Sequence, residues 1–323
     1  MSDRGQYLDV ILAVVISFVM SNLGVGALVF TLPLLVLAKR TSRLKTDTAC
    51  VAVLVLVLLK LVFTMRSVVP DALTLGPVGV NLFVPLSLIL GALVWVNTTS
   101  EPLFRRILLM CVPPFVVFFL LEIWFSLDQE VALGVMEDYR NLYRELIVSL
   151  AGDSAEMSDL VFQVFMYGIL GCVVAFTCLL NIANAFVASV SGRIYDPAKD
   201  ERIMYFRVPA WFIYPFLLLW ADVLAINFVD VPVQLMLSVV NLAVMSLMIY
   251  GMQGFAIVYF NLRRRMENLR SIRLFFVFAF LMFFFVGANL ILWFGLPLVG
   301  VLENWVELRK RKQGVYKNED HSL

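Results

Sequence analysis

The sequence lacks most of the residues on which soluble enzymes depend. Its 323 residues include a single histidine, His321, and only 15% of them are charged. A metal site built on histidine and a serine–histidine triad are therefore excluded. The four cysteines form no CxxC pair, and no GxxxxGK, HExxH or GxSxG motif occurs. We therefore expect a protein that is not an enzyme, with no metal site and no cofactor.

Apolar residues are abundant instead. Hydrophobic residues make up 62% of the chain, the mean hydropathy is +0.92, and there are 27 phenylalanines. This composition is far from that of a soluble domain. No stretch is long and polar enough to form a second domain. We therefore expect one integral membrane domain over residues 1–312, followed by a polar cytoplasmic tail over 313–323.

Most of the apolar residues fall into runs that are long enough to cross a membrane. About 20 apolar residues in a helix span the ~30 Å hydrocarbon core of a bilayer. The runs lie near residues 8–22, 24–38, 47–65, 79–97, 103–126, 160–189, 207–228, 231–261, 273–293 and 296–308. The predicted fold is an all-α polytopic transmembrane helix bundle with eight to ten spans in the lipid bilayer.

Positive charges alternate along the chain. Basic residues concentrate in every second connection, at 39–45, 105–106, 193–207 and 263–273. The segment 128–159 holds eight acidic residues and only two arginines. Basic loops stay in the cytoplasm, so we predict a plasma (inner) membrane location with both termini in the cytoplasm. The arginines of 263–273 are explained as an orientation signal, and no nucleic-acid partner is expected.

Breaks interrupt the apolar runs at both ends of the chain. The motif SNLGVG at 21–26 divides the first run, and Gly295–Pro297 divides the last one. A turn at each break predicts a short helical hairpin, and the second hairpin returns the basic residues 309–312 to the cytoplasm. The alternative at each end is one long span.

Three ionisable residues, Lys60, Glu122 and Asp222, lie inside apolar runs at a similar distance from the predicted outer ends. Charge in a span is costly and marks a pathway, a ligand contact or an internal ion pair. One carboxylate could bind a cationic ligand, or Lys60 could bind a carboxylate ligand. Alternatively, all three side chains snorkel to the outer interface. Neutral polar residues complete the predicted substrate-binding candidates: Asn22, Asn289 and Gln253.

Two further patterns suggest contacts. The small residues Ala13, Ser17 and Ser21 recur at every fourth position, which allows another helix to approach closely, either within the chain or from a partner subunit. In the segment 127–159 apolar residues recur at helical spacing. We interpret this amphipathic helix as a cover over an outward-facing cavity or as a simple interfacial helix.

The second half of the chain resembles a known family. The segment FRVPAWFIYPFLLLW (206–220), the Tyr-x-x-Gln-Gly motif within 241–264, and GLPLVGVLENWVELRKR (295–311) resemble, in order and spacing, the YybS-like predicted membrane proteins. The chain departs from that family at Glu303 and Glu307, where the family has aspartates. The family is classed as a domain of unknown function, and it is distantly similar to the S-components of energy-coupling-factor vitamin transporters. The resemblance implies a small-molecule ligand bound from outside and a partner subunit that docks on small residues of an early helix.

Two function hypotheses follow. The first is the substrate-binding membrane component of an uptake system for a vitamin- or metabolite-like small molecule. Such a component would take its energy from a partner subunit or an ion gradient, because the sequence has no nucleotide-binding motif. The second is a non-transporting membrane scaffold for envelope assembly or cell division.

Overall fold

The computed structural model describes residues 3–66, 75–128, 130, 132–138, 140–141, 145, 155–190, 203–265 and 291–309. Every regular element in these ranges is a helix. Five helices are long and apolar enough to cross a membrane: Arg43–Phe63, Gly79–Asn97, Leu103–Leu127, Met166–Ser189 and Val233–Arg264. Shorter apolar helices lie at Gly5–Met20, Gly26–Leu37, Ala210–Ala225 and Leu292–Leu302. The protein is therefore a multi-pass helical membrane protein, and the predicted all-α fold is confirmed.

The chain forms two compact units. Unit 1 comprises Met1–Tyr195 and Leu219–Met245, and unit 2 comprises Asp196–Leu218 and Ser246–Leu323. Helices α10 (Ile213–Ala225) and α11 (Val233–Arg265) each contribute residues to both units. The boundaries therefore fall inside apolar helices, where no change of composition marks them.

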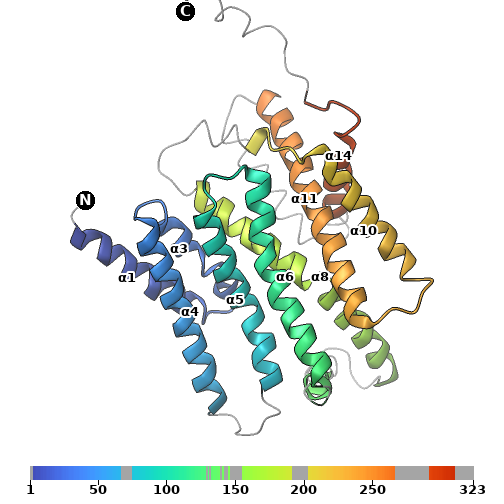
Figure 1. Ribbon diagram of the computed structural model, residues 1–323, viewed down its shortest axis with the longest axis horizontal. Coiled ribbons are helices and arrows are strands. Elements are labelled where there is room, and N and C mark those ends of the chain that lie inside the picture. The colour runs from blue at the N-terminus through green and yellow to red at the C-terminus, as the bar shows by residue number, and fades with distance from the viewer. Residues whose placement is uncertain are drawn as a thin grey trace, which may run out of the picture. The chain divides into compact units, whose positions relative to one another are not determined.

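Unit 1 is built mainly from the N-terminal helices. They are α1 (Asp3–Met20), α2 (Gly26–Val29), α3 (Leu32–Leu37), α4 (Arg43–Arg66), α5 (Leu75–Asn97), α6 (Leu103–Leu127) and α8 (Ala155–Val190). Helix α5 packs between α4 and α6, and these three helices run side by side in Figure 1. Helix α8 contacts α3, α5 and α6. This arrangement places the ends of several spans next to one another.

The core of unit 1 lies where α1, α3, α4 and α5 meet. Phe30, Leu34, Val53 and Leu88 are completely buried there. Lipid tails are as apolar as these side chains, so close packing holds such helices together more than the hydrophobic effect does. Small residues at the contacts, among them Ala49 and Cys50, permit that packing.

Long apolar side chains cover the outside of unit 1. Exposed residues follow one face of each of α1, α4 and α6: Leu8, Ile11, Leu12, Val15, Val19, Val51, Val55, Leu59, Val62, Val112, Val116, Phe119 and Leu120. Exposed apolar surface of this extent is uncommon on soluble monomers. It is the surface that a bilayer covers in a membrane protein.

The predicted break at SNLGVG is confirmed. Helix α1 ends at Met20 and α2 begins at Gly26. The Ser21 hydroxyl and the Asn22 amide both donate to the Phe18 carbonyl, at 2.7 and 2.6 Å, and so satisfy an end of α1. Helix α3 then packs against α1. The first apolar run is therefore two short segments, as predicted, and the second is itself divided into α2 and α3.

The small-residue stripe of α1 faces other helices of the same chain. Ala13 is 7% exposed, Ser17 is completely buried and Ser21 is half-buried. Helix α1 contacts α3 and α4, and Ala13 belongs to the core described above. This placement agrees with the intramolecular interpretation. Docking of a partner subunit on these residues stays a prediction.

Unit 2 contains the η2 turn (Ala210–Phe212), parts of α10 and α11, the π-helix η3 (Ile291–Gly295) and α14 (Leu296–Leu302). The predicted turn at Gly295–Pro297 is wrong. Gly295 has helical angles, with φ −67° and ψ −44°, and η3 runs directly into α14. Pro297 lies in the first turn of α14, and the wider π-helical turn before it accommodates the missing N–H. Residues 266–290 lie outside the described ranges, and with them Asn289 and most of the span predicted at 273–293.

Candidate functional site

Glu122 is an acidic side chain within the spanning helix α6, in unit 1. Its Oε2 atom accepts a hydrogen bond of 2.8 Å from the Ser238 hydroxyl of α11. Its Oε1 atom is buried and has no hydrogen-bond partner among the described residues. A carboxylate in a membrane span is expensive to keep charged unless a partner neutralises it. The free oxygen therefore marks a position where a cation or a ligand donor would be stabilised.

A hollow lies one helical turn from this carboxylate. It measures about 570 Å³ and is lined by Phe125, Ser126, Ala132, Leu133 and Gln234. Ser126 lies one turn after Glu122 on α6, and its hydroxyl donates to the Glu122 carbonyl at 2.7 Å. The volume falls in the range of small-molecule sites, and the lining combines apolar surface with a few polar groups.

Part of the hollow comes from the segment that the sequence predicts as a cover. Residues 132–138 are helical, in agreement with the predicted amphipathic helix. Val135 is 5% exposed, whereas Leu133 is 70% exposed and lines the hollow. The segment therefore contributes an apolar wall next to Glu122.

Asn241 connects the same region of α11 to α8. Its amide group donates to the Leu170 carbonyl at 2.7 Å and accepts from the Val174 N–H at 3.0 Å. The side chain thus bonds to the Val174 N–H and the Leu170 carbonyl, which are one turn apart on the backbone of α8. Ser238 and Asn241 are three positions apart and share one face of α11. The bridge to α8 helps to hold the face that presents Ser238 to Glu122.

The other two charged candidates are not joined to Glu122. Lys60 is half-buried on α4, and Asp222 is exposed on α10. No ion pair connects either of them to Glu122 within the described part of the chain. Asn22 is exposed and its amide is used at the end of α1. Of the residues in unit 1 predicted to bind substrate, Glu122 alone combines burial with an unused polar atom.

Gln253, in unit 2, is completely buried and its amide is fully used. Its Oε1 atom accepts from the Val208 N–H at 2.6 Å. Its Nε2 atom donates to the Gly300 carbonyl at 2.9 Å and to the Glu303 carboxylate at 3.0 Å. Gln253 therefore joins α11 to two other segments of unit 2, which is an internal structural contact. Neither polar atom of the Gln253 side chain is left free to bind a substrate, the role that the sequence predicts for this residue.

Glu303 and Arg309 form a buried ion pair beside Gln253. Their side chains are 5% and 8% exposed. The Arg309 guanidinium donates from Nε to Glu303 Oε1 at 2.6 Å and from Nη2 to Oε2. Its Nη1 atom donates to the Met204 carbonyl at 2.6 Å. This bidentate pair leaves the buried charges neutralised and hydrogen-bonded. We refer to Gln253, Glu303 and Arg309 as the polar cluster of unit 2.

The polar cluster also includes Arg309, the first residue of the basic segment that follows the last apolar run. The contact with the Met204 carbonyl places Arg309 beside the start of the segment 203–209, which also contains Arg207. Arg309 and the segment 203–209 thus lie near each other within unit 2. The placement of residues 193–207 and 309–312 on the cytoplasmic side of the membrane stays a prediction.

Two glycines let α14 approach α11 closely. A Cβ atom at Gly254 would lie 1.8 Å from the Leu296 carbonyl oxygen, and one at Gly300 would lie 2.0 Å from the Tyr250 carbonyl oxygen. No other residue type fits at either position without separating the helices. Tyr250, Gln253 and Gly254, the residues of the Tyr-x-x-Gln-Gly motif, therefore all lie at or beside the contact with α14.

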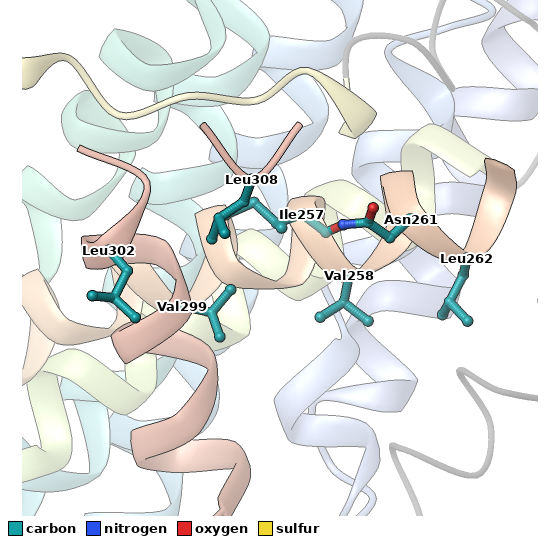
Figure 2. A pocket seen from close by; sticks show the side chains of 7 residues that line it. All are labelled: Ile257, Val258, Asn261, Leu262, Val299, Leu302 and Leu308. Atoms are coloured by element: carbon teal, nitrogen blue, oxygen red, sulfur yellow. The ribbon is translucent and has the colours of Figure 1, made fainter. Parts of the chain in front are cut away.

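An apolar groove of about 450 Å³ runs beside the polar cluster (Figure 2). Its walls come from α11, from α14 and from Leu308: Ile257, Val258, Asn261, Leu262, Val299, Leu302 and Leu308. The Asn261 amide donates to the Ile257 carbonyl of its own helix at 2.9 Å. The groove therefore presents almost only apolar surface, in contrast to the hollow next to Glu122.

Sequence reasoning missed several residues of these sites. Ser238, Asn241, Glu303 and Arg309 were not among the predicted site residues. A serine or asparagine in a span is common, and its partner lies tens of residues away. In the sequence, Arg309 belongs to a basic cluster that indicates the orientation of the last span. A glutamate six residues before it was the available signal, but that spacing does not match a helix face.

No protein-family model, no curated protein and no solved structure matches the chain. The functional proposal therefore depends on the geometry of the Glu122 site.

Proposed function

We propose that the protein is the substrate-binding membrane component of a small-molecule uptake system, and that Glu122 binds a positively charged group of the ligand. The observation that supports the proposal most directly is the buried Glu122 Oε1 atom without a described partner, one turn from a hollow of about 570 Å³. A bound ammonium group would supply the missing partner and neutralise the carboxylate within the span.

The surroundings of Glu122 suit an organic cation more than a metal ion. No group of three or more His, Cys, Asp or Glu side chains that could hold a metal ion occurs among the described residues. Phe125 offers an aromatic ring in the lining of the hollow, and Leu133 offers apolar surface. Aromatic rings and a carboxylate together recognise ammonium groups. We therefore favour a ligand with an ammonium group and an apolar body.

The charge of the segment that follows the hollow in the sequence supports binding from the predicted outer side. The segment 128–159, which continues from the hollow, carries eight acidic residues against two arginines. Such a surface raises the local concentration of cations. Energy would come from a partner subunit or an ion gradient, since the chain has no nucleotide-binding motif. The resemblance to YybS-like proteins and, at a distance, to S-components agrees with this role and stays a prediction.

Glu122→Gln is expected to weaken binding of an ammonium ligand by about ten- to hundredfold, the range for loss of a charged hydrogen bond. The measurement is the thermal shift of the purified protein with a panel of primary, secondary and quaternary amines. Asp222→Asn is the matched control, because it removes an exposed carboxylate from another apolar helix. We expect at least one amine to stabilise the wild type and the Asp222 variant but not the Glu122 variant. An amine that stabilises all three proteins equally would contradict the role of Glu122. If no amine stabilises the wild type, the result would contradict the uptake proposal and favour a scaffold without a ligand.

A further inference from the structure

A second charged surface of unit 1 lies where α4 and α6 begin. The connections at 39–45 and 105–106 contribute six basic residues: Lys39, Arg40, Arg43, Lys45, Arg105 and Arg106. In these two connections and the residues that flank them, only Asp47 and Glu101 are acidic, and α1, whose Gln6 accepts from Lys45 Nζ at 2.7 Å, adds Asp9 one turn further along. We call the six residues the basic face. It is separate from the Glu122 site, which lies near the other end of α6.

Hydrogen bonds gather the two connections into one surface. The Asn97 side chain accepts from Arg43 Nε and donates to Asp47 Oδ1 at 3.0 Å, which joins the start of α4 to the end of α5. Lys39 Nζ donates to the Ala188 carbonyl and, at 2.9 Å, to the Ser189 carbonyl at the end of α8. The ends of α3, α5 and α8 and the starts of α4 and α6 therefore meet at the basic face.

Arg106 is fixed at the edge of the basic face. Its guanidinium lies 3.5 Å from the centre of the Trp95 ring, and its Nε donates to the Trp95 carbonyl at 3.1 Å. Tryptophan is enriched where a membrane protein meets the headgroup region. The stacked pair therefore agrees with a position at the level of the lipid headgroups.

Several charges of the basic face point to solvent. The Arg40 side chain is exposed and makes no hydrogen bond within the described part of the chain, and Arg43, whose Nε donates to Asn97, is exposed as well. The Arg105 side chain is 67% exposed and pairs with Glu101 at 3.0 Å. Helix α6 begins here without a side-chain cap, so its first N–H groups add positive potential. An anion at this face would meet guanidinium groups and helix N–H donors together.

Apolar surface continues from the charges along α4. Leu44, next to Arg43, is 76% exposed, and Val51 and Val55 are 51% and 47% exposed. Positions 44, 51 and 55 share one face of a helix. A free phosphate ion would use only the charges, whereas a phospholipid would use the charges for its headgroup and this apolar face for an acyl chain.

We propose that the basic face binds the phosphate group of an anionic phospholipid, with an acyl chain along Leu44, Val51 and Val55. Each basic residue near an anionic membrane surface contributes a factor of about five in affinity. Removing the three exposed arginines is therefore expected to weaken retention of the lipid on the order of a hundredfold.

Native mass spectrometry of the full-length protein in neutral detergent tests the proposal, with phosphatidylglycerol and phosphatidylcholine as competing probes. We expect the wild type to retain phosphatidylglycerol in preference to phosphatidylcholine. Arg40→Gln/Arg43→Gln/Arg105→Gln should lose that preference, and the lysine triple variant at the same positions should keep most of it. If the glutamine triple variant does not fold, Arg40→Gln alone should still weaken retention about fivefold.

The matched control is Arg207→Gln/Arg263→Gln/Arg264→Gln, which removes the same charge from unit 2. It should retain phosphatidylglycerol as the wild type does. Equal loss in both triple variants would mean that net charge alone attracts the lipid, and it would overturn the proposal. Displacement of the lipid by millimolar inorganic phosphate would overturn it as well, because the site would then take the free anion.

Discussion

Glu303→Gln is expected to lower the free energy of unfolding of the protein by about 3–5 kcal/mol, the usual cost of removing one partner of a buried ion pair. The substitution keeps the shape of the side chain but leaves the Arg309 guanidinium, only 8% exposed, without a counter-charge. It also changes the acceptor of the Gln253 Nε2–H group. The cost is large because water cannot reach the charge that remains.

The measurement is reversible unfolding in mixed micelles of detergent and denaturing surfactant. Glu101→Gln is the control, because the Glu101–Arg105 pair is 30% and 67% exposed and should contribute no more than about 1 kcal/mol. Glu303→Leu/Arg309→Met should recover at least half of the lost free energy, since an apolar pair leaves no buried charge. If Glu303→Gln and Glu101→Gln lower the free energy of unfolding equally, the Glu303–Arg309 pair is not buried in the membrane-embedded protein.

Gly254→Ala and Gly300→Ala are each expected to destabilise the protein by about 3 kcal/mol, near the upper end for overpacked cores. The added methyl groups would lie 1.8 and 2.0 Å from carbonyl oxygens of the facing helix. Backbone atoms cannot move aside as a flexible side chain can, so α11 and α14 must separate. Separation also weakens the bonds from Gln253 to Gly300 and Glu303.

Gly168→Ala provides the matched control for both variants. Gly168 lies within α8, and a Cβ atom there would have no neighbour within 4 Å. Alanine favours helix over glycine by about 1 kcal/mol, so this variant should be neutral or slightly more stable in the same unfolding experiment. A neutral result for Gly254→Ala as well would show that the two helices do not pack as closely as described.

Local features of the sequence predicted local structure well. Asn22 and the glycines of SNLGVG favour a turn through their own chemistry, and the chain breaks there. The glycine and proline of Gly295–Pro297 also favour a turn, but the chain continues there as a helix. A proline in the first turn of a helix costs little, and the π-helix before it absorbs the change in hydrogen bonding. Whether a glycine and a proline close together reverse the chain depends on the helices that pack against that segment.

The polar residues show a similar limit. Hydropathy alone identified Glu122 and Gln253 as unusual, because each interrupts an apolar run. It could not distinguish their surroundings. Gln253 meets partners about 50 residues away and has no atom left for a ligand. Glu122 meets one hydroxyl group and keeps a free oxygen. Contacts between residues far apart in the sequence decide whether a polar side chain is fully hydrogen-bonded or keeps an unused atom. The periodicity of a single sequence does not reveal those contacts.

Native mass spectrometry of the protein purified gently from its own membrane, in the wild-type and Glu122→Gln forms, tests directly whether Glu122 binds a cationic ligand. We expect the wild type to retain a small molecule with an ammonium group, the Glu122 variant to have lost it, and Asp222→Asn to retain it. Equal retention of a ligand by the wild type and the Glu122 variant would show that Glu122 does not bind it. A wild-type protein that carries no small molecule in any of several mild detergents would show that the protein has no such ligand.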